Sequence, residues 1–467
     1  MGYAAISPVV YYPNSGQISY YSSVDVVFHT NATANATAAF NTMLRGDENT
    51  LSSLANKVDN SQRISNYPLL DETDEIATDY VIITSNDFVD EFEVLADFKN
   101  RRGVSTIIET VENIAASFTG VDLQDKIRNY IIYAYGEWSI DYVLLAADDE
   151  ILPHRGLYAS AYTYTDDDIA SDLYYGGLDG NWNNDGDSYW GEIGEDDLEP
   201  EVAVGRAAID ASTEAVNFIN KQIMYQQSPV SQECDNALFV GEELWSDVYC
   251  EWTFGATYKD EVRLGSSNHG YTTVGLPTTF ETTTLYDLTI CPSSWSAMGN
   301  LLPLLNSGFN FVNHLGHSNV TYCMRFNNSD VNDVNFTNDG VNHGFWVGYS
   351  QGCYDGSFDN RTTSGSYTED CICEVFATIQ HGPAGFIGNS RYGWGDHQST
   401  NGSSQYFDRQ FFDAIFGEDI TRIGPANDDS KVDNIWAISY AANRWCYYEL
   451  NVFGDPELDL WTDVPQT

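Results

Sequence analysis

The stretch Tyr80-Val81-Ile82-Ile83-Thr84 is an uninterrupted apolar run of strand length. A strand that is apolar on both faces is typical of a parallel sheet covered by helices on each side. The amphipathic segment 88–102 follows and ends at Gly103, a residue type that commonly terminates helices. The next apolar run, 104–108, has strand character again. This alternation predicts an α/β fold with a mostly parallel sheet.

The same alternation continues along most of the chain. Further strands are expected at 142–146, 201–209, 237–241, 308–313, 346–350 and 384–388. Further helices are expected at 123–135, 214–225, 294–305, 368–381, 404–416 and 434–450. The segment 152–200 interrupts the alternation as a long loop rich in Asp, Gly and Tyr. With 467 residues, the chain exceeds the size of a single core. We therefore expect two adjacent α/β subdomains, 76–229 and 230–462, in a three-layer α/β/α sandwich.

The N-terminal region does not follow this alternation. Residues 1–45 are predicted to be a short β segment, and 46–75 a polar linker with helix-like spacing at 51–58. The start lacks the charged and apolar regions of a signal peptide. We expect a trimmed or mature chain from a longer precursor, with a propeptide remnant at its start. No run of 18 apolar residues occurs, so no membrane span is predicted.

The composition is strongly acidic. The 69 Asp and Glu residues outnumber the 20 Lys and Arg residues, which gives a net charge of -49. Nucleic acids are excluded as partners, because phosphate binding depends on Lys and Arg. A negative field of this size attracts cations, either Ca²⁺ or basic peptides. Adaptation to salty surroundings is an equally good explanation and is compatible with the first.

Sequons and cysteines bear on the compartment. Seven Asn-X-Ser/Thr sequons suit an extracellular or cell-surface glycoprotein: Asn31, Asn35, Asn319, Asn327, Asn335, Asn360 and Asn401. None of the eight cysteines forms a CxxC pair, which argues against a zinc ribbon. The pairing of the cysteines stays open.

A histidine and a cysteine follow two of the predicted strands. The apolar run 309–312 leads into Asn313-His314-Leu315-Gly316-His317-Ser318, and 346–350 leads into Gln351-Gly352-Cys353-Tyr354. Ligands of open α/β sheets bind beyond the carboxyl ends of the strands. A thiol peptidase needs a cysteine nucleophile beside an imidazole at such a place. We interpret the glycine before each residue as room for a substrate backbone.

Residues from Tyr80 to Trp461 resemble the gingipain family of cysteine peptidases, which shares a caspase-like fold with caspases and legumains. The matching motifs occur in the family's order: Asp141-Tyr142-Val143-Leu144-Leu145, Ile151-Leu152-Pro153, Ser171-Asp172-Leu173-Tyr174-Tyr175, Leu178-Asp179-Gly180, Val204-Gly205-Arg206, Leu315-Gly316-His317, Gly352-Cys353, Gly388-Asn389-Ser390-Arg391-Tyr392-Gly393-Trp394 and Val452-Phe453-Gly454-Asp455-Pro456-Glu457-Leu458. The resemblance implies a caspase-like fold and peptidase activity on a peptide or protein substrate.

The resemblance also implies the roles of particular residues. His317 matches the family's catalytic histidine, and Cys353 matches its nucleophile. The backbone N–H groups of Ser318 and Cys353 match the oxyanion hole, although the family usually has glycine where Ser318 stands. His314 and His343 are competitors for the role of base. The acids after the strand 142–146 are candidates for an orienting carboxylate, mainly Glu150 and Asp148, with Asp149 beside them.

Two residues resemble the arginine pocket of arginine-cleaving members. Asp172 matches the acidic residue of that pocket and Trp394 its aromatic wall, so a basic residue before the scissile bond (P1) is expected. For Asp172 the alternatives are calcium ligation or a role in loop structure.

The loop 181–192 has the spacing of a calcium-binding loop. Oxygen-bearing side chains stand at loop positions one, three and five, glycine at six and glutamate at twelve. The predicted Ca²⁺ ligands are Asp179, Asn181, Asn183, Asp185, Asp187 and Glu192. An acidic surface loop without a metal is the alternative.

The leading hypothesis is a secreted cysteine endopeptidase with a Cys353–His317 dyad. A sortase-like transpeptidase that uses the same dyad, and a catalytically inactive, calcium-stabilised surface protein, are kept as alternatives.

Overall fold

A computed structural model of the chain describes residues 9–12, 17–23, 27, 61, 78–245, 255–291 and 293–465. The chain divides into two compact units, Met1–Asp74 and Glu75–Thr467. In the first unit, β1 (Val9–Tyr12) and β2 (Gln17–Tyr20) pair antiparallel within the predicted β segment. The expected linker 46–75, with its helix-like spacing at 51–58, lies outside the described residues apart from residue 61.

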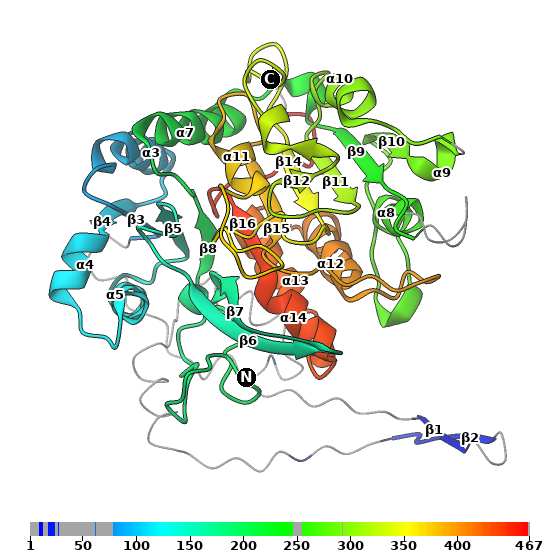
Figure 1. Ribbon diagram of the computed structural model, residues 1–467, viewed down its shortest axis with the longest axis horizontal. Coiled ribbons are helices and arrows are strands. Elements are labelled where there is room, and N and C mark those ends of the chain that lie inside the picture. Colours follow the sequence, from blue (N-terminus) through cyan, green and yellow to red (C-terminus); the bar gives the residue numbers. More distant parts are fainter. Residues whose placement is uncertain are drawn as a thin grey trace. The chain divides into compact units, whose positions relative to one another are not determined.

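Ten strands of the second unit form one mostly parallel sheet (Figure 1). In spatial order they are β10 (Glu281–Tyr286), β9 (Asn236–Gly241), β11 (Phe311–Leu315), β14 (Val347–Ser350), β15 (Gly385–Asn389), β16 (Leu450–Phe453), β8 (Ala203–Arg206), β5 (Tyr142–Ala146), β3 (Tyr80–Thr84) and β4 (Thr106–Thr110). The expected subdomains 76–229 and 230–462 both contribute strands to this sheet. β16 runs antiparallel to β15 and meets β8 at the single pair Phe453↔Arg206.

The helices cover both faces of the sheet. On one side α3 (Val89–Arg102), α7 (Ser212–Gln227) and α11 (Ile372–Thr378) pack in a row. On the other, α12 (Ser403–Gly417) packs against α8 (Gly255–Leu264), α13 (Ile423–Val432) and α14 (Ala441–Glu449). The other helices of the described residues are α4 (Val111–Ser117), α5 (Leu123–Trp138), α6 (Leu173–Gly176), α9 (Asp287–Ile290) and α10 (Leu302–Leu305), with short helical turns at Ser231–Glu233, Asn268–Gly270, Ala297–Leu301, Asn328–Asp330 and Ile435–Ala437. The predicted α/β/α sandwich is confirmed.

The central strands are the apolar runs of the sequence. Every residue of β3, β11, β14 and β15 is buried, because helices cover both faces of these strands. Two clusters of buried apolar side chains lie on the side of the sheet covered by α3, α7 and α11. The sheet therefore provides a rigid platform, and its loops carry the polar residues.

The segment 152–200 contains more regular structure than the sequence predicts. It folds into a hairpin of β6 (Arg155–Ala161) and β7 (Tyr164–Ser171). β7 includes three consecutive aspartates, a residue type depleted in strands, so a strand was not expected there. Two short strands, β12 (Tyr322–Cys323) and β13 (Phe326–Asn327), form a further small hairpin.

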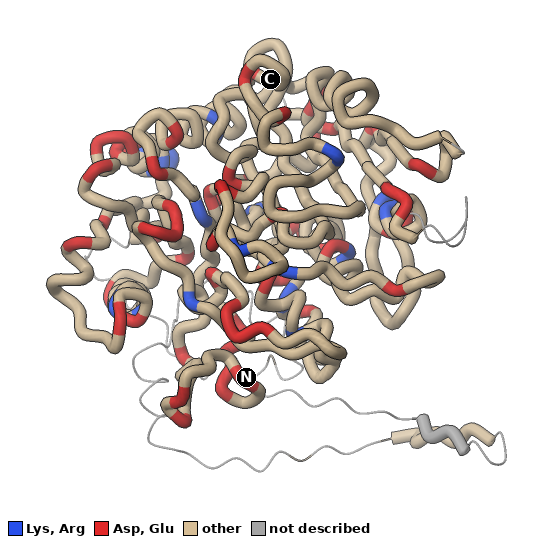
Figure 2. Tube along the Cα trace, in the orientation of Figure 1, with Lys and Arg blue, Asp and Glu red and all other residues tan. Residues whose placement is uncertain are grey.

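The few basic residues are largely internal. Ten of the seventeen Lys and Arg residues in the described part of the chain are buried: Lys99, Arg128, Arg155, Arg206, Lys221, Lys259, Arg391, Arg409, Lys431 and Arg444. Acidic residues are distributed over most of the elements (Figure 2). Within the described part of the chain, no helix is long and apolar enough to cross a membrane.

Candidate active site

The loops carrying His317 and Cys353 leave neighbouring strands at the same edge of the sheet. His314 of β11 pairs with Ser350 of β14, and the Gln351 N–H donates to the His314 carbonyl at 3.1 Å. His317 and Cys353 each stand three residues beyond that pair. A Cβ added at Gly352 would overlap Oγ of Ser318, so the two loops are in direct contact.

The Cys353 thiol is free, partly exposed and set in a strained turn. Its Sγ lies 3.8 Å from the Gly393 carbonyl oxygen. The next residue, Tyr354, has φ of 61°, a conformation that costs energy outside glycine and often occurs at functional sites. Burial, followed by the negative charge of Glu449, raises the pKa of the Cys353 thiol to about 12. The thiol is therefore protonated at neutral pH in this conformation and needs a base for activation.

The His317 ring is exposed and is held by a backbone carbonyl. Its Nε2 lies 2.9 Å from the carbonyl oxygen of Leu244, which follows β9. A carbonyl only accepts hydrogen bonds, so Nε2 carries the proton and Nδ1 keeps its lone pair for use as a base. Among the described contacts, no hydrogen bond joins this ring to the Cys353 sulfur. Catalytic hydrogen bonds are often long before substrate binds, so this does not argue against the pair.

The two competing histidines are less suited to act on Cys353. His314 is fully buried, and its Nδ1 lies 3.8 Å from the Sγ of the equally buried Cys323. Burial raises the pKa of that thiol well above its usual value, and no substrate can reach it. His343 precedes β14 and is bound to Glu233 at 2.8 Å, near the opposite end of the strand. The geometry thus favours His317.

The two glycines before His317 and Cys353 serve a different purpose from the one expected. A Cβ at Gly316 would overlap the carboxylate of Glu242, just as one at Gly352 would overlap Ser318. Both glycines make room for protein side chains, so the interpretation that they admit a substrate backbone is not supported. Ser318 is not among the described non-glycine residues with positive φ, so serine fits this backbone without strain.

The predicted orienting carboxylates do not lie beside His317. The carboxyl group of Asp148 is buried next to Glu374 and Glu150, and burial raises its pKa to about 7. The strand order places β5, which precedes these acids, five inter-strand spacings from β11, roughly 24 Å. The strand order was not foreseeable from the sequence. In the described structure, the ring partner of His317 is Leu244.

Asp172 does not offer a free carboxylate to a substrate. Its two oxygens accept hydrogen bonds from Nη2 and Nε of the buried Arg206 at 2.7 and 2.8 Å. This pairing favours the alternative role in loop structure, and the expected pocket role stays a prediction. The matching motif could not reveal Arg206, because the arginine comes from β8.

Trp394 lies close to the candidate nucleophile, and its pocket role stays a prediction. It follows Gly393, whose carbonyl is next to the Cys353 sulfur. The indole ring is partly exposed, and the exposed rings of Tyr162 and Tyr164 lie 5.3 and 5.6 Å from it. These tyrosines stand at the tip of the β6–β7 hairpin, in the segment predicted to be a loop. The candidate nucleophile is thus bordered by aromatic rings.

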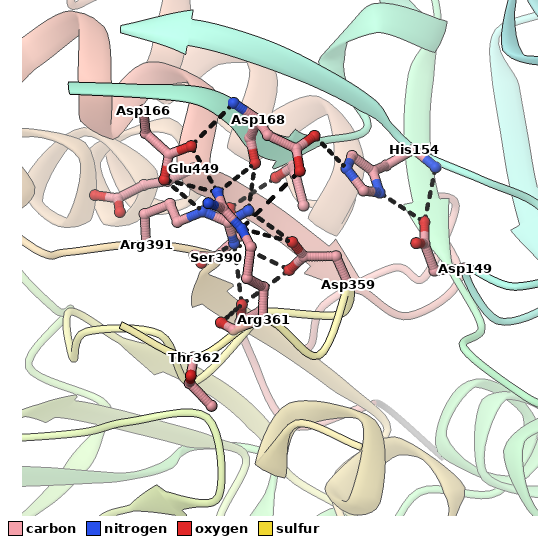
Figure 3. A network of polar contacts seen from close by, with 12 residues as sticks. Asp149, His154, Asp166, Asp168, Asp359, Arg361, Thr362, Ser390, Arg391 and Glu449 are labelled. Atoms are coloured by element: carbon pink, nitrogen blue, oxygen red, sulfur yellow. Dashed lines mark hydrogen bonds and ion pairs between the residues drawn. The ribbon is translucent and has the colours of Figure 1, made fainter. Parts of the chain in front are cut away.

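A partly buried charge network fixes this hairpin to the Cys353 loop (Figure 3). Arg391, immediately before Tyr392, contacts Asp166 at 3.1 Å and Asp359 at 2.7 Å. Arg361 also binds Asp166 at 2.6 Å. His154 continues the network through Asp149 and Asp168, at 2.7 and 3.3 Å respectively. The sequence reasoning missed this network; a run of aspartates in a chain with few basic residues was the available signal.

The predicted calcium loop forms only in part. Asp185 and Glu192 lie together, joined by the unpredicted Glu195. Desolvation and the nearby carboxylates of Asp187 and Asp185 raise the pKa of Glu192, a repulsion that a cation would relieve. Asn183 and Asp187 instead accept hydrogen bonds from Gly186 and Tyr189 N–H groups.

The remaining predicted ligands fall elsewhere. Asp179 lies with Asp197 and Glu201, two acids that were not predicted as ligands. Asn181 is exposed. Both carboxylate groups offer oxygen atoms only, which suits Ca²⁺ chemically.

Comparison with known proteins matches almost all of the second unit to one family. The family model of Peptidase family C25 matches residues 73–461. Gingipain R2 of Porphyromonas gingivalis is 21% identical over 243 residues, which cover 52% of this chain and 28% of that protein. Gingipain R1 of the same organism is also 21% identical over 243 residues, and the match covers 20% of that protein. The match therefore spans less than a third of the length of these relatives.

Solved structures share the fold. The Arg-specific cysteine proteinase gingipain R has a TM-score of 0.60 at 18% identity, covering 84% of this chain and 80% of that chain. A complex of the RgpB pro- and mature domains from Porphyromonas gingivalis gives 0.59 at 18% identity, with 83% and 81% coverage. At this level of identity the likeness is one of fold.

Proposed function

The chain belongs to peptidase family C25, which confirms the resemblance to gingipains, and from this membership we propose that it is a cysteine endopeptidase acting through Cys353 and His317. The observation that carries the assignment is the contact between the two loops: Ser318, next to His317, packs on Gly352, next to Cys353. The free and partly exposed state of the Cys353 thiol supports it.

The proposed reaction proceeds through a thioester. Nδ1 of His317 takes the proton of the Cys353 thiol, and the sulfur attacks the carbonyl carbon of the scissile bond. The imidazolium then protonates the leaving amine as the C–N bond breaks. Water, deprotonated by the same ring, attacks the thioester, and the carboxylic acid product leaves while the thiol is restored. Leu244 holds the tautomer that this cycle requires.

The negative oxygen of each tetrahedral intermediate needs preorganised donors. The backbone N–H groups of Ser318 and Cys353 are our candidates, because both lie where the two loops meet. Neither donates to a backbone carbonyl among the described hydrogen bonds. One donor of this type typically lowers a barrier by about 3–4 kcal/mol.

The substrate preference is proposed from the aromatic border. Asp172 is engaged by Arg206, so an arginine at P1 has no carboxylate there to pair with. Trp394 remains the candidate pocket residue, with Tyr162 and Tyr164 beside it. These rings provide an apolar surface, and a cation above their faces would gain only about 0.5–2 kcal/mol. A basic P1 residue is therefore tolerated in this proposal, without being required.

Calcium binding and an extracellular or cell-surface location complete the proposal. The oxygen-only groups Asp185–Glu192–Glu195 and Asp179–Asp197–Glu201 support a structural Ca²⁺ role. The net charge of -49 and the sequons suit an extracellular setting. Ca²⁺ takes no part in the proposed chemical steps.

The test is a cleavage profile of the purified chain on a peptide library, with the variants Cys353→Ala and His317→Ala. We expect each variant to lose at least about a thousandfold in kcat/KM. Cys234→Ala, which removes a thiol near the start of β9, is the matched control and should cleave normally. Cleavage by Cys353→Ala at the wild-type rate would end the assignment.

The same experiment addresses the alternatives. Mass spectrometry of the products separates hydrolysed acids from the amine-linked products of a transpeptidase. A catalytically inactive protein would cleave nothing, and its Cys353 would react with iodoacetamide no faster than an ordinary thiol. Neither alternative is favoured by the family match.

A further inference from the structure

A chain of buried polar side chains lies directly beneath the two catalytic loops. Oε1 of Glu242, just after β9, is 3.1 Å from Nε2 of His314. Nδ1 of the same ring is 3.0 Å from Oγ of Ser350, and that oxygen is 2.6 Å from Oδ2 of Asp355. The Cys323 sulfur joins the far end, 3.3 Å from Oδ2 of Asp355. All five side chains are buried.

A count of hydrogens shows that this row of side chains needs one more proton than their ordinary ionisation states supply. With both carboxylates ionised and His314 neutral, Nε2–H donates to Glu242, because a carboxylate only accepts. The single Ser350 hydrogen can then serve Nδ1 of His314 or Asp355, and the other contact would bring two lone pairs together. One added proton on Asp355, where burial raises the pKa of the carboxyl group, satisfies every contact. Buried polar groups rarely stay unpaired, so we expect this row of side chains to keep the added proton.

Three of these side chains, those of Ser350, Asp355 and Glu242, also contact the backbone of the catalytic loops or of the neighbouring strand. The Gly352 N–H donates to Oγ of Ser350 at 3.1 Å, one residue before Cys353. Oδ1 of Asp355 accepts the Asn389 N–H at 3.0 Å and ties the Cys353 loop to the end of β15. The Glu242 carboxylate packs against Gly316, one residue before His317, and the Glu242 N–H donates to the Leu315 carbonyl at 2.9 Å.

The guanidinium of Arg325 binds the Glu242 end of this row of side chains. Nε of Arg325 lies 3.4 Å from the second oxygen of Glu242. The same guanidinium binds Asp287 at 2.5 Å, which fixes its position. The Glu242 side chain is therefore held between Arg325 and His314.

We propose that Glu242, His314, Ser350 and Asp355 form a proton-sharing relay that sets the backbone of the Cys353 and His317 loops at reacting distance. These residues are positioning residues: they touch neither substrate nor the reacting sulfur. The proposal rests on the peptidase function proposed above. It assigns the supporting carboxylates to Glu242 and Asp355, on the sheet half that carries the dyad.

The test compares three variants of the full chain with a matched control. Ser350→Ala removes the central oxygen, and Asp355→Ala removes the far acceptor. Asp355→Asn supplies a permanent N–H donor in place of the shared proton. Ser430→Ala, which deletes a buried hydroxyl bonded to the Asn427 carbonyl in α13, is the control for loss of a buried hydrogen bond. Each protein is measured for kcat, for KM and for the rate at which iodoacetamide alkylates Cys353.

We expect Ser350→Ala and Asp355→Ala to lower kcat by about 10- to 100-fold, with KM within about twofold, because a small displacement of reacting groups costs this much. Asp355→Asn should recover kcat to within about fivefold of wild type. Ser430→Ala should match wild type in every kinetic measure. Equal losses in Asp355→Asn and Asp355→Ala, or an unchanged kcat in Ser350→Ala, would overturn the relay.

The rate at which iodoacetamide alkylates Cys353 tests the relay even if the peptidase assignment fails. Should the wild-type chain cleave no substrate, the relay still predicts that Ser350→Ala and Asp355→Ala change the Cys353 alkylation rate by at least about threefold, since the loop moves. Asp355→Asn and Ser430→Ala should keep the wild-type rate. Identical alkylation rates in all five proteins would refute the relay whatever the activity.

Discussion

Replacing Asp172 with alanine should lower the free energy of unfolding of this protein and leave its substrate preference unchanged. The side chain of Arg206 is completely buried, and that of Asp172 is 6% exposed. The substitution removes both carboxylate oxygens that the guanidinium binds, at 2.7 and 2.8 Å. Arg206 keeps its Nη1 bonds to the carbonyls of Ala147 and Leu152, but its charge loses its only close counterion in the described structure.

The magnitude follows from that buried charge. Breaking a buried ion pair by removing one partner typically costs about 3–5 kcal/mol, because the remaining charge stays desolvated. Folded domains are stable by only about 5–15 kcal/mol, so the loss is a large part of the total. Urea unfolding should show a midpoint lowered by about 1–2 M.

Two further variants make the measurement specific. Asp167→Ala removes an exposed acid from the same hairpin and should leave the midpoint within about 0.3 M of wild type. The double variant Asp172→Leu with Arg206→Met removes both charges and should be more stable than Asp172→Ala. The reasoning would be refuted if Asp172→Ala kept the wild-type midpoint and selectively lost cleavage after arginine.

The remaining predictions concern pH, salt, calcium and the base. Burial alone would lower the pKa of His154, but the carboxylates of Asp149 and Asp168 outweigh it and raise this pKa to about 10. The resulting stability, on the order of 1–3 kcal/mol, should be complete below pH 6.5 and disappear as pH rises through 10, and urea titrations of His154→Gln should lack this decline. Because the net charge is -49, repulsion between surface carboxylates should destabilise the fold, and raising KCl from about 0.1 M to about 2 M should therefore raise the thermal midpoint. A thermal midpoint that falls when KCl is added would contradict this explanation. Ca²⁺ should raise the thermal midpoint of wild type, and EDTA should reverse the effect. Glu192→Gln should weaken Ca²⁺ binding measured by calorimetry, whereas Glu93→Gln, which changes an exposed acid of α3 outside the candidate groups, should not. His343→Asn should cleave at the wild-type rate while His317→Asn is inactive; the reverse result would move the base to the other end of β14.

Several features of this protein were determined by the sequence alone. The apolar runs at 80–84, 142–146 and 346–350 correspond to buried strands, because a strand covered on both faces is apolar at every position. The same reasoning places His317 and Cys353 at the carboxyl ends of two strands, where β11 and β14 prove to be neighbours. These are local properties, and a short stretch of chain carries all the information they need.

Other features depend on which distant residues meet, and only the tertiary structure decides that. The order of strands separates β5 from β11, so the acids at 148 and 150 stand far from the histidine they were expected to orient. Arg206 from β8 pairs with the carboxylate of Asp172. Arg361 and Arg391 pair with Asp166 and so stabilise the aspartate-rich strand β7. A buried charge is stable only with a partner of opposite charge. No spacing in the sequence encodes the position of that partner in the fold. This position determines whether an acidic residue binds a substrate or stabilises the protein.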